Sequence, residues 1–275
     1  MLYDSEFVLT LCIAAKFPWG IMATLPGPPI PQAILFATDS RLTDLANRTI
    51  DIAEKLFPIC SNAGLVFSGN YEIGRTCVQE LQSELKEKQT IVAREIFSIA
   101  HSTLKQKFRQ LAHTFDYRYL SVMLGVYDYE NSQAKLVGYE SPSFQPVEMT
   151  GVTAIGSTSE IKRLYKRKLV RFVKERFSHG GGVGDSPLEW LNFIQIVLDN
   201  AVIELGLDPH VGGLVQTAII ERVGFNWVGH SARKPTGKWI STLRRREHWH
   251  KIEVDSQREI ARTEKHPHGF FSISK

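Results

Sequence analysis

The sequence predicts an α+β domain in which two stacked β-sheets carry helices on their outer faces. Along the chain, the apolar pattern runs in the order strands, two helices, strands, two helices, strands. Two groups of strands, each followed by a pair of helices, are typical of a layered sandwich. With 275 residues, of which 43% are hydrophobic, the chain can bury a large core as one domain or two.

The first strand group occupies the N-terminal quarter of the chain. Residues 7–17 form an almost unbroken apolar run, as expected of a strand buried on both faces. Residues 18–32 are rich in proline and cannot continue a central strand, so they predict an elongated hairpin loop or a protrusion. The returning strand and two shorter strands are predicted at Ala33–Thr38, Leu56–Cys60 and Gly64–Phe67.

Helical and extended patterns then alternate. Apolar residues recur at helical spacing in Tyr71–Lys88 and in Thr90 to about His113. The strands that follow are predicted at Tyr119–Tyr127, Ala134–Tyr139 and about Pro146–Ile155. A second helix pair is predicted at Ser159–Phe177 and Ser186–Leu205; the latter opens with a capping box that has proline at the first helical position.

The C-terminal part of the chain divides into a hairpin and a basic segment. Val215–Arg222 and Phe225–Val228 predict a closing hairpin with Gly224 in its turn. The last forty-odd residues are polar and basic. We therefore predict one domain over residues 1–230 and an extension over residues 231–275 that is partly disordered or folds against a partner.

Composition limits the location of the protein. No apolar run approaches the length needed to cross a bilayer, and the acidic Asp4 and Glu6 beside the first one make a secretory signal unexpected. Cys12, Cys60 and Cys77 form no CxxC pair and are odd in number, which disfavours a disulfide scaffold and a zinc site and favours a reducing cytoplasm. The net charge of +4 is too small to identify a partner.

One constellation of residues has the composition of a catalytic site. The strand Ala33–Thr38 runs into the turn Asp39-Ser40-Arg41, Lys55 stands sixteen residues beyond Asp39 and is expected on a following strand, and Ser68-Gly69 comes later. A carboxylate, an ammonium group and an unobstructed backbone N–H are the groups that a hydroxyl nucleophile needs around it.

From about residue 7 to residue 228, these motifs resemble the proteasome-like branch of the N-terminal nucleophile hydrolases. The matching positions, in order, are Thr10 at the head of the first strand, Asp39-Ser40-Arg41 with Thr43, Lys55, Ser68-Gly69, Gly156-Ser157, and Asp208 with Gly212-Gly213. The resemblance implies a four-layer αββα sandwich.

The resemblance also implies a chemistry for these residues. Thr10 would attack an amide carbonyl, and Lys55, held by Asp39, would lower the pKa of its hydroxyl and relay the proton. The N–H of Gly69 would face the developing oxyanion, and Ser157 and Asp208 would orient the free amine of the nucleophile and a water. The implied substrate is a peptide or an unfolded protein, the implied assembly is a homo-oligomeric ring, and no cofactor or metal is implied.

A non-catalytic ring or scaffold subunit of the same fold is the alternative hypothesis. In active members of the family the nucleophile is the first residue of the mature chain, whereas Thr10 follows nine residues and would have to be freed by cleavage after Leu9. Autocleaving relatives usually carry glycine before the threonine. In addition, Val211 stands where the family has a serine.

Each candidate residue also has a structural interpretation when it is considered singly. Thr10 could be a buried β-branched residue, Asp39 could cap its turn or pair with Arg41, and Lys55 could be a solvated lysine at a strand edge. Cys12 lies inside an apolar strand, and we interpret it as an inert core residue rather than a nucleophile.

The remaining polar motifs do not indicate a second site. The run Gly180–Gly184 follows a helix and lacks a closing Lys-Ser/Thr, so we interpret it as a flexible loop between helices rather than a phosphate cradle. The four clustered histidines at 248, 250, 266 and 268 could bind a metal, but they lie in a polar tail without fixed geometry. The basic helix 161–176 and Arg244–Arg246 allow a third hypothesis, nucleic-acid binding, but an apolar stripe on that helix favours a solvated basic face. Neither a nucleic acid nor a membrane is therefore an expected partner.

Overall fold

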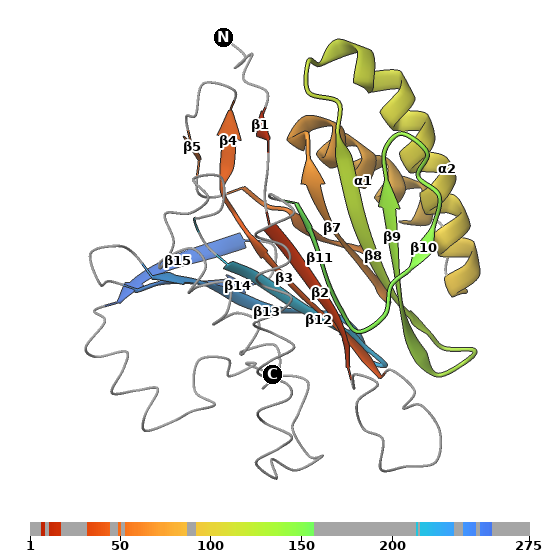
Figure 1. The fold of residues 1–275 in the computed structure, drawn as a ribbon. Coiled ribbons are helices and arrows are strands. Elements are labelled where there is room, and N and C mark those ends of the chain that lie inside the picture. Colours follow the sequence, from red (N-terminus) through yellow and green to blue (C-terminus); the bar gives the residue numbers. More distant parts are fainter. Residues whose placement is uncertain are drawn as a thin grey trace.

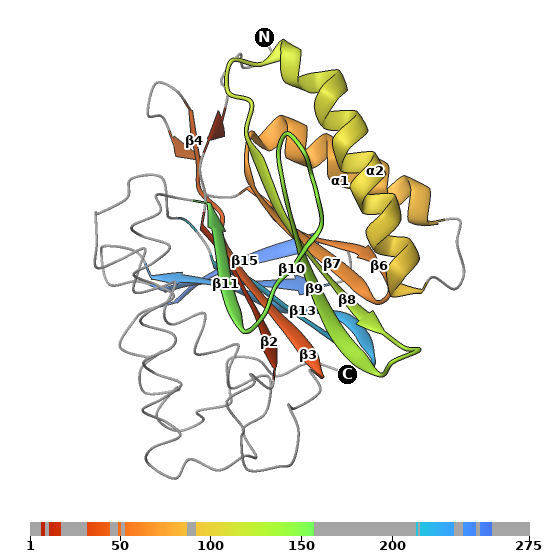
Figure 2. The ribbon, with the colours of Figure 1, turned by 45° about the vertical axis from the view of Figure 1, so that its right-hand side comes forward.

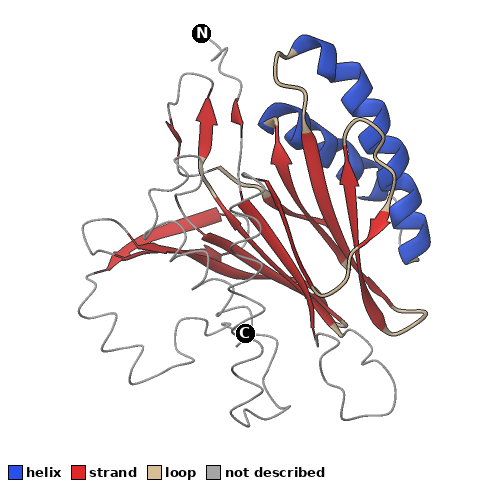
Figure 3. Ribbon diagram, in the orientation of Figure 1, coloured by secondary structure: helices blue, strands red, loops and turns tan. Residues whose placement is uncertain are grey.

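The computed structural model describes residues 7–8, 11–17, 32–44, 49–50, 53–86, 92–156, 213, 215–233, 239–245 and 248–254. Within these residues the chain forms two large antiparallel sheets, a small three-stranded sheet and two long helices (Figure 1). Figure 3 shows the helices gathered on one side of the strands.

The larger sheet has seven strands in the order β11-β2-β3-β12-β13-β14-β15. Their bounds are β2 Leu11–Phe17, β3 Ala33–Asp39, β11 Val152–Gly156, β12 Val215–Glu221, β13 Gly224–Arg233, β14 Trp239–Arg245 and β15 His248–Val254. The first hairpin pairs Cys12 with Thr38, and β12 lies on the other side of β3, with Gln216 opposite Thr38. The sheet thus brings the start of β2, the end of β3 and the start of β12 together.

The second sheet has five strands in the order β10-β9-β8-β7-β6. Their bounds are β6 Leu56–Cys60, β7 Ala63–Gly69, β8 Leu120–Asp128, β9 Gln133–Glu140 and β10 Val147–Glu148. The helices α1 (Tyr71–Lys86) and α2 (Ala93–Leu111) cover its outer face, and the short 3-10 helix η1 (Ala112–Thr114) follows α2 (Figure 2). A separate small sheet contains β1 (Phe7–Val8), β4 (Leu42–Asp44) and β5 (Thr49–Ile50).

The two large sheets pack face to face through an apolar core. Because side chains alternate along a strand, Phe36 of β3 and Val66 of β7 point into this core, whereas Leu65 and Phe67 point to the opposite face of β7, toward the helices. The side chains in the inter-sheet core include Cys12, Ala14, Ile34, Phe36, Leu56, Val66, Met123, Tyr127, Leu136 and Ile220.

A second core lies between the five-stranded sheet and the helices. Helix α1 begins where Asn70 accepts the Ile73 N–H at 3.1 Å, an N-cap interaction that satisfies one of the open amides of the first turn. One face of α1 and one face of α2 are buried on the sheet. Gly74 is required at this contact, because a Cβ atom there would lie 2.4 Å from the ring of Phe67.

The structure confirms the predicted α+β sandwich. Ile13 and Leu35 of the seven-stranded sheet lie outside the inter-sheet core and are also fully buried. The predicted helices 159–177 and 186–205 and most of the proline-rich stretch 18–32 lie outside the described residues.

Three details differ from the sequence-based expectation. The single strand predicted at 146–155 is two strands, β10 and β11, which belong to different sheets and are separated by Gly151 at φ +63°. The short strands β4 and β5 were not predicted. The apolar run 7–17, predicted as one strand, contains two, β1 in the small sheet and β2 in the seven-stranded sheet. The domain boundary at residue 230 stays a prediction; β13 spans this residue, and β14 and β15 pair beyond it in the same sheet.

Replacing Phe36 by alanine tests the inter-sheet core. Phe36 is fully buried between the sheets, so Phe36→Ala should lower the free energy of unfolding by about 3–5 kcal/mol. The control is Val223→Ala in the exposed β12–β13 turn, where the side chain is 79% exposed and the expected change is within about 0.5 kcal/mol. Urea denaturation measures both. Equal effects of the two substitutions would contradict the described core.

Candidate active site

Asp39 ends strand β3 and is completely buried. Its Oδ2 accepts the Arg41 N–H at 3.2 Å, which closes the turn in the manner usual for aspartate two residues ahead of a backbone amide. Its Oδ1 accepts the Leu11 N–H, the first amide of β2, at 2.9 Å. The turn interpretation of Asp39 is therefore confirmed, and the same carboxylate also holds the head of the first long strand.

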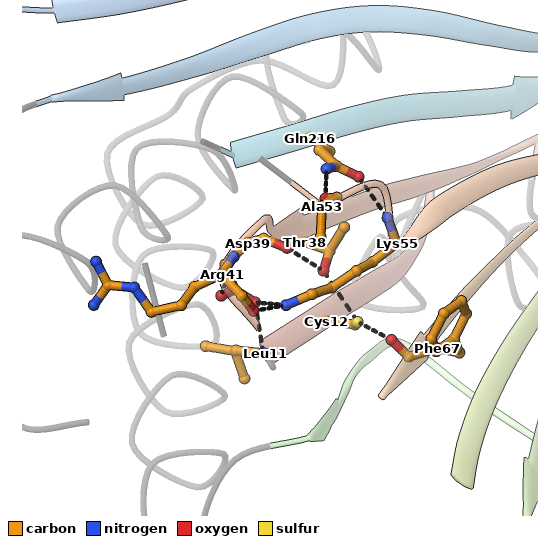
Figure 4. A network of polar contacts seen from close by, with 9 residues as sticks. All are labelled: Leu11, Cys12, Thr38, Asp39, Arg41, Ala53, Lys55, Phe67 and Gln216. Atoms are coloured by element: carbon orange, nitrogen blue, oxygen red, sulfur yellow. Dashed lines mark hydrogen bonds and ion pairs between the residues drawn. The ribbon is translucent and has the colours of Figure 1, made fainter. Parts of the chain in front are cut away.

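Lys55 lies immediately before β6 rather than on a strand, and it is 1% exposed. Its Nζ donates a hydrogen bond to the Arg41 carbonyl and forms an ion pair of 3.5 Å with Oδ1 of Asp39. The interpretation of Lys55 as a solvated edge lysine is therefore wrong. Figure 4 shows the lysine side chain extended toward the turn, with the Arg41 guanidinium directed away from it.

Burial makes this ion pair an energetically significant feature. Taking two charges out of water costs several kcal/mol per ion, and the pair is tolerated because each charge neutralises the other and has further hydrogen bonds. Asp39 receives two backbone N–H groups, and Lys55 binds a carbonyl oxygen. The carboxylate and the ammonium group are therefore both removed from water. The carboxylate bonds directly to the first amide of β2, and the ammonium group is paired with that carboxylate.

Thr10, the expected nucleophile, lies outside the described residues. The described chain nearest to it forms strands, β1 before it and β2 after it. Leu11 begins β2, and the backbone of Phe7–Val8 forms β1, in which Val8 pairs with Thr43 of β4. The segment that would have to be removed to free Thr10 is thus paired with the strand that follows the Asp39 turn.

Cys12 is close to the site but faces the inter-sheet core. Its Sγ lies 3.1 Å from the Thr38 hydroxyl and donates to the Phe67 carbonyl at 3.3 Å. Burial raises the pKa of this thiol from 9.0 to about 12, although the contact with Thr38 opposes the shift. The neutral thiol is a poor nucleophile, which supports the interpretation of Cys12 as a core residue.

Gly69 ends β7 with φ +117°, a conformation that favours glycine. A Cβ atom at this position would lie 2.2 Å from the Tyr119 carbonyl oxygen, so the fold alone requires glycine here. Its expected role as an oxyanion donor stays a prediction. Ser157 and Asp208 lie outside the described residues, and Gly156, the neighbour of Ser157, ends β11.

Gln216 of β12 is a site residue that the sequence analysis missed. Its Oε1 accepts the Lys55 N–H at 3.0 Å, and its Nε2 donates to the Ala53 carbonyl (Figure 4). In the sequence it is one of the polar residues of a mostly apolar strand, and this pattern does not reveal a partner 161 residues away.

The described part of the chain gives no indication of a metal site, a disulfide or a membrane-spanning helix. It contains no group of three His, Cys, Asp or Glu side chains that could hold a metal ion, and Cys12, Cys60 and Cys77 are free thiols. None of its helices is long and apolar enough to cross a membrane. Of the tail histidines, 248 and 250 lie on β15, with undescribed side chains, and 266 and 268 lie outside the described residues.

A double-mutant cycle tests the coupling of Asp39 and Lys55. Asp39→Asn and Lys55→Met should each lower the free energy of unfolding by roughly 3–5 kcal/mol, because each leaves a buried charge without its partner. The double variant should lose less than the sum by about 1–3 kcal/mol. The matched control is the more exposed pair Lys107–Glu80, where the coupling should stay below about 1 kcal/mol. Additive effects at Asp39 and Lys55 would contradict a direct pair.

Alkylation tests the assignment of Cys12 to the core. Below its raised pKa the thiol is neutral and buried, so iodoacetamide at pH 8 should leave Cys12 of the folded protein unmodified while it modifies the partly exposed Cys60. Peptide mass mapping, with urea-unfolded protein as the control for complete reaction, measures both sites. Modification of Cys12 at the rate of Cys60 would show that the thiol is accessible and reactive.

Comparison with known proteins agrees with this architecture. The model of the proteasome subunit family matches residues 30–176, which is more than half of the chain and includes Asp39, Lys55, Gly69 and both described helices. No curated protein matches the chain. Members of the family form oligomeric rings. On the basis of the family match and the sandwich fold, the chain belongs to the proteasome subunit family.

Proposed function

We propose that this chain is a threonine-type N-terminal nucleophile hydrolase that cleaves peptide amide bonds, with Thr10 as the nucleophile after removal of residues 1–9. The observation that carries this proposal is the buried Asp39–Lys55 pair at the head of β2. Leu11, which follows Thr10 in the chain, donates its N–H directly to Asp39.

The buried Asp39–Lys55 pair could have a structural role or a catalytic one, and the chemistry of the lysine favours the catalytic role. Asp39 closes the turn through the Arg41 N–H, and Lys55 supplies the counter-charge of this buried carboxylate and a hydrogen bond to the Arg41 carbonyl. A buried ion pair often stabilises a protein no more than apolar residues of similar size would. A lysine ammonium beside a hydroxyl, in contrast, favours the alkoxide and can relay a proton, which is the activation that a threonine nucleophile needs.

In the proposed reaction, the Thr10 hydroxyl attacks the carbonyl carbon of the substrate amide while its proton passes to the free α-amine of Thr10. The C–N bond of the amide then breaks, the amine product leaves with that proton, and an ester with Thr10 remains as the acyl-enzyme. Lys55 stabilises the developing negative charge on the hydroxyl oxygen, and Asp39 orients Lys55 through the ion pair. The Gly69 N–H stabilises the oxyanion, and Ser157 and Asp208 orient the amine and the water that hydrolyses the acyl-enzyme. The substrate class is a peptide or an unfolded protein.

A non-catalytic ring subunit is the second candidate, and the pairing of β1 with β4 favours it. Residues 7–8 form part of a small sheet, so their removal would break backbone pairs with Asp44 and Thr43. Leu9 and Val211, which depart from the family pattern, favour the same reading. For either candidate we expect a homo-oligomeric ring in the cytoplasm.

The intact mass of the purified protein tests the proposal. Loss of residues 1–9 together with peptide hydrolysis supports the hydrolase, and Thr10→Ala should abolish both, because it removes the hydroxyl. The control Thr103→Ala removes a threonine hydroxyl that is buried on α2, and it should leave cleavage and hydrolysis unchanged. A full-length chain without amidase activity would refute the hydrolase in favour of the non-catalytic subunit. Hydrolysis that persists in Thr10→Ala would refute Thr10 as the nucleophile.

A further inference from the structure

We propose that Gln216 is a positioning residue for Lys55, and that its side-chain amide fixes the ammonium group at the Asp39 turn. The inference deepens the proposed function, on which its catalytic consequence rests. The proposal depends on two hydrogen bonds of the Gln216 side chain, and their effect on Lys55 can be measured without an activity assay.

The amide of Gln216 holds the chain just before β6 at two points. Its Oε1 accepts the N–H of Lys55, and its Nε2 donates to the carbonyl of Ala53. Only a side chain with both a donor and an acceptor can make this pair of bonds. Gln216 is 1% exposed, so neither bond competes with bulk water.

The two bonds from Gln216 help to hold residues 53–55 in place, because this segment has no regular secondary structure of its own. Other backbone contacts of the segment include the bond from the Ala53 N–H to the Ser40 carbonyl at 3.0 Å and a longer bond of 3.4 Å from the Phe67 N–H to the Lys55 carbonyl. The short segment is therefore held on one side by the Asp39 turn and on the other by β12.

The position of Gln216 in the sheet explains how it reaches the site. Gln216 pairs with Thr38, the residue immediately before Asp39, so β12 places the amide beside the end of β3. A single strand pair thus sets the distance between the carboxylate on β3 and the backbone from which the lysine extends (Figure 4). Loss of the amide should let the lysine backbone move away from Asp39 and should weaken the 3.5 Å ion pair.

A purely structural role is the competing explanation, and a second buried amide provides a matched control. Asn62 is 4% exposed in the turn between β6 and β7, where it donates to the Tyr127 carbonyl at 2.8 Å. It also accepts a hydrogen bond from the Cys60 thiol. Replacing Asn62 removes the same kind of side-chain group from the opposite end of β6.

The test is the rate at which an N-hydroxysuccinimide ester of acetic acid acetylates Lys55 in the folded protein, followed by peptide mass mapping. In Gln216→Met, which keeps the shape and loses both bonds, the Lys55 rate should rise about tenfold over wild type, corresponding to about 1.4 kcal/mol. Gln216→Asn is too short to make both bonds and should give a smaller rise. Asn62→Leu should leave the rate unchanged, and Lys107 and Lys135, which are partly exposed, serve as internal references.

The peptidase assay adds a second readout. If Gln216 acts through Lys55, Gln216→Met should lower kcat and leave KM nearly unchanged, whereas Asn62→Leu should change neither. An unchanged Lys55 rate in both Gln216 variants, or an equal rise in Asn62→Leu, would overturn the positioning role. If wild type hydrolyses no peptide, the proposed function fails, while the acetylation rates still decide whether Gln216 positions Lys55.

Discussion

The buried ion pair between Asp39 and Lys55 is the interaction on which the arrangement of the site depends. The carboxylate receives the first amide of β2 and the amide of Arg41, and the ammonium group binds the Arg41 carbonyl. Through Gln216, β12 holds the backbone from which the lysine extends. Three strands of one sheet therefore converge on two charges, and removal of either charge leaves the other buried without its counter-charge.

Different features near this ion pair favour each of the two candidate functions, the hydrolase and the non-catalytic subunit. A buried lysine ammonium beside a hydroxyl would favour the alkoxide and relay its proton, which is the activation that amide cleavage needs. The pairing of Phe7–Val8 with β4 shows that the chain before Thr10 has a place of its own in the fold. An active enzyme would have to release that strand; a structural subunit would keep it. Either candidate is consistent with the match of this chain to the proteasome subunit family.

Local patterns of apolar residues predicted much of the fold, because the spacing of apolar residues shows which side chains are buried in a strand or a helix. The apolar run 33–38 and the helical spacing in 71–88 correspond to β3 and α1. The split of 146–155 into two strands was missed, since a turn at Gly151 leaves little trace in an apolar pattern. The spacing of Asp39 and Lys55 indicated the site, but its supports are long-range: the Gln216 amide and the Leu11 N–H reach it only through strand pairing. Thr10, Ser157 and Asp208 stay predictions.

The most direct test of the central claim is covalent labelling with a peptide β-lactone, an electrophile that acylates activated hydroxyl groups. If Lys55 and Asp39 activate Thr10, peptide mapping should find the acyl group on Thr10 of the processed wild-type protein and should find none in Lys55→Met. Urea-unfolded protein is the control for intrinsic reactivity. Absence of an adduct in wild type, or an adduct on Thr10 that persists in Lys55→Met, would contradict the claim that the buried pair prepares a nucleophile.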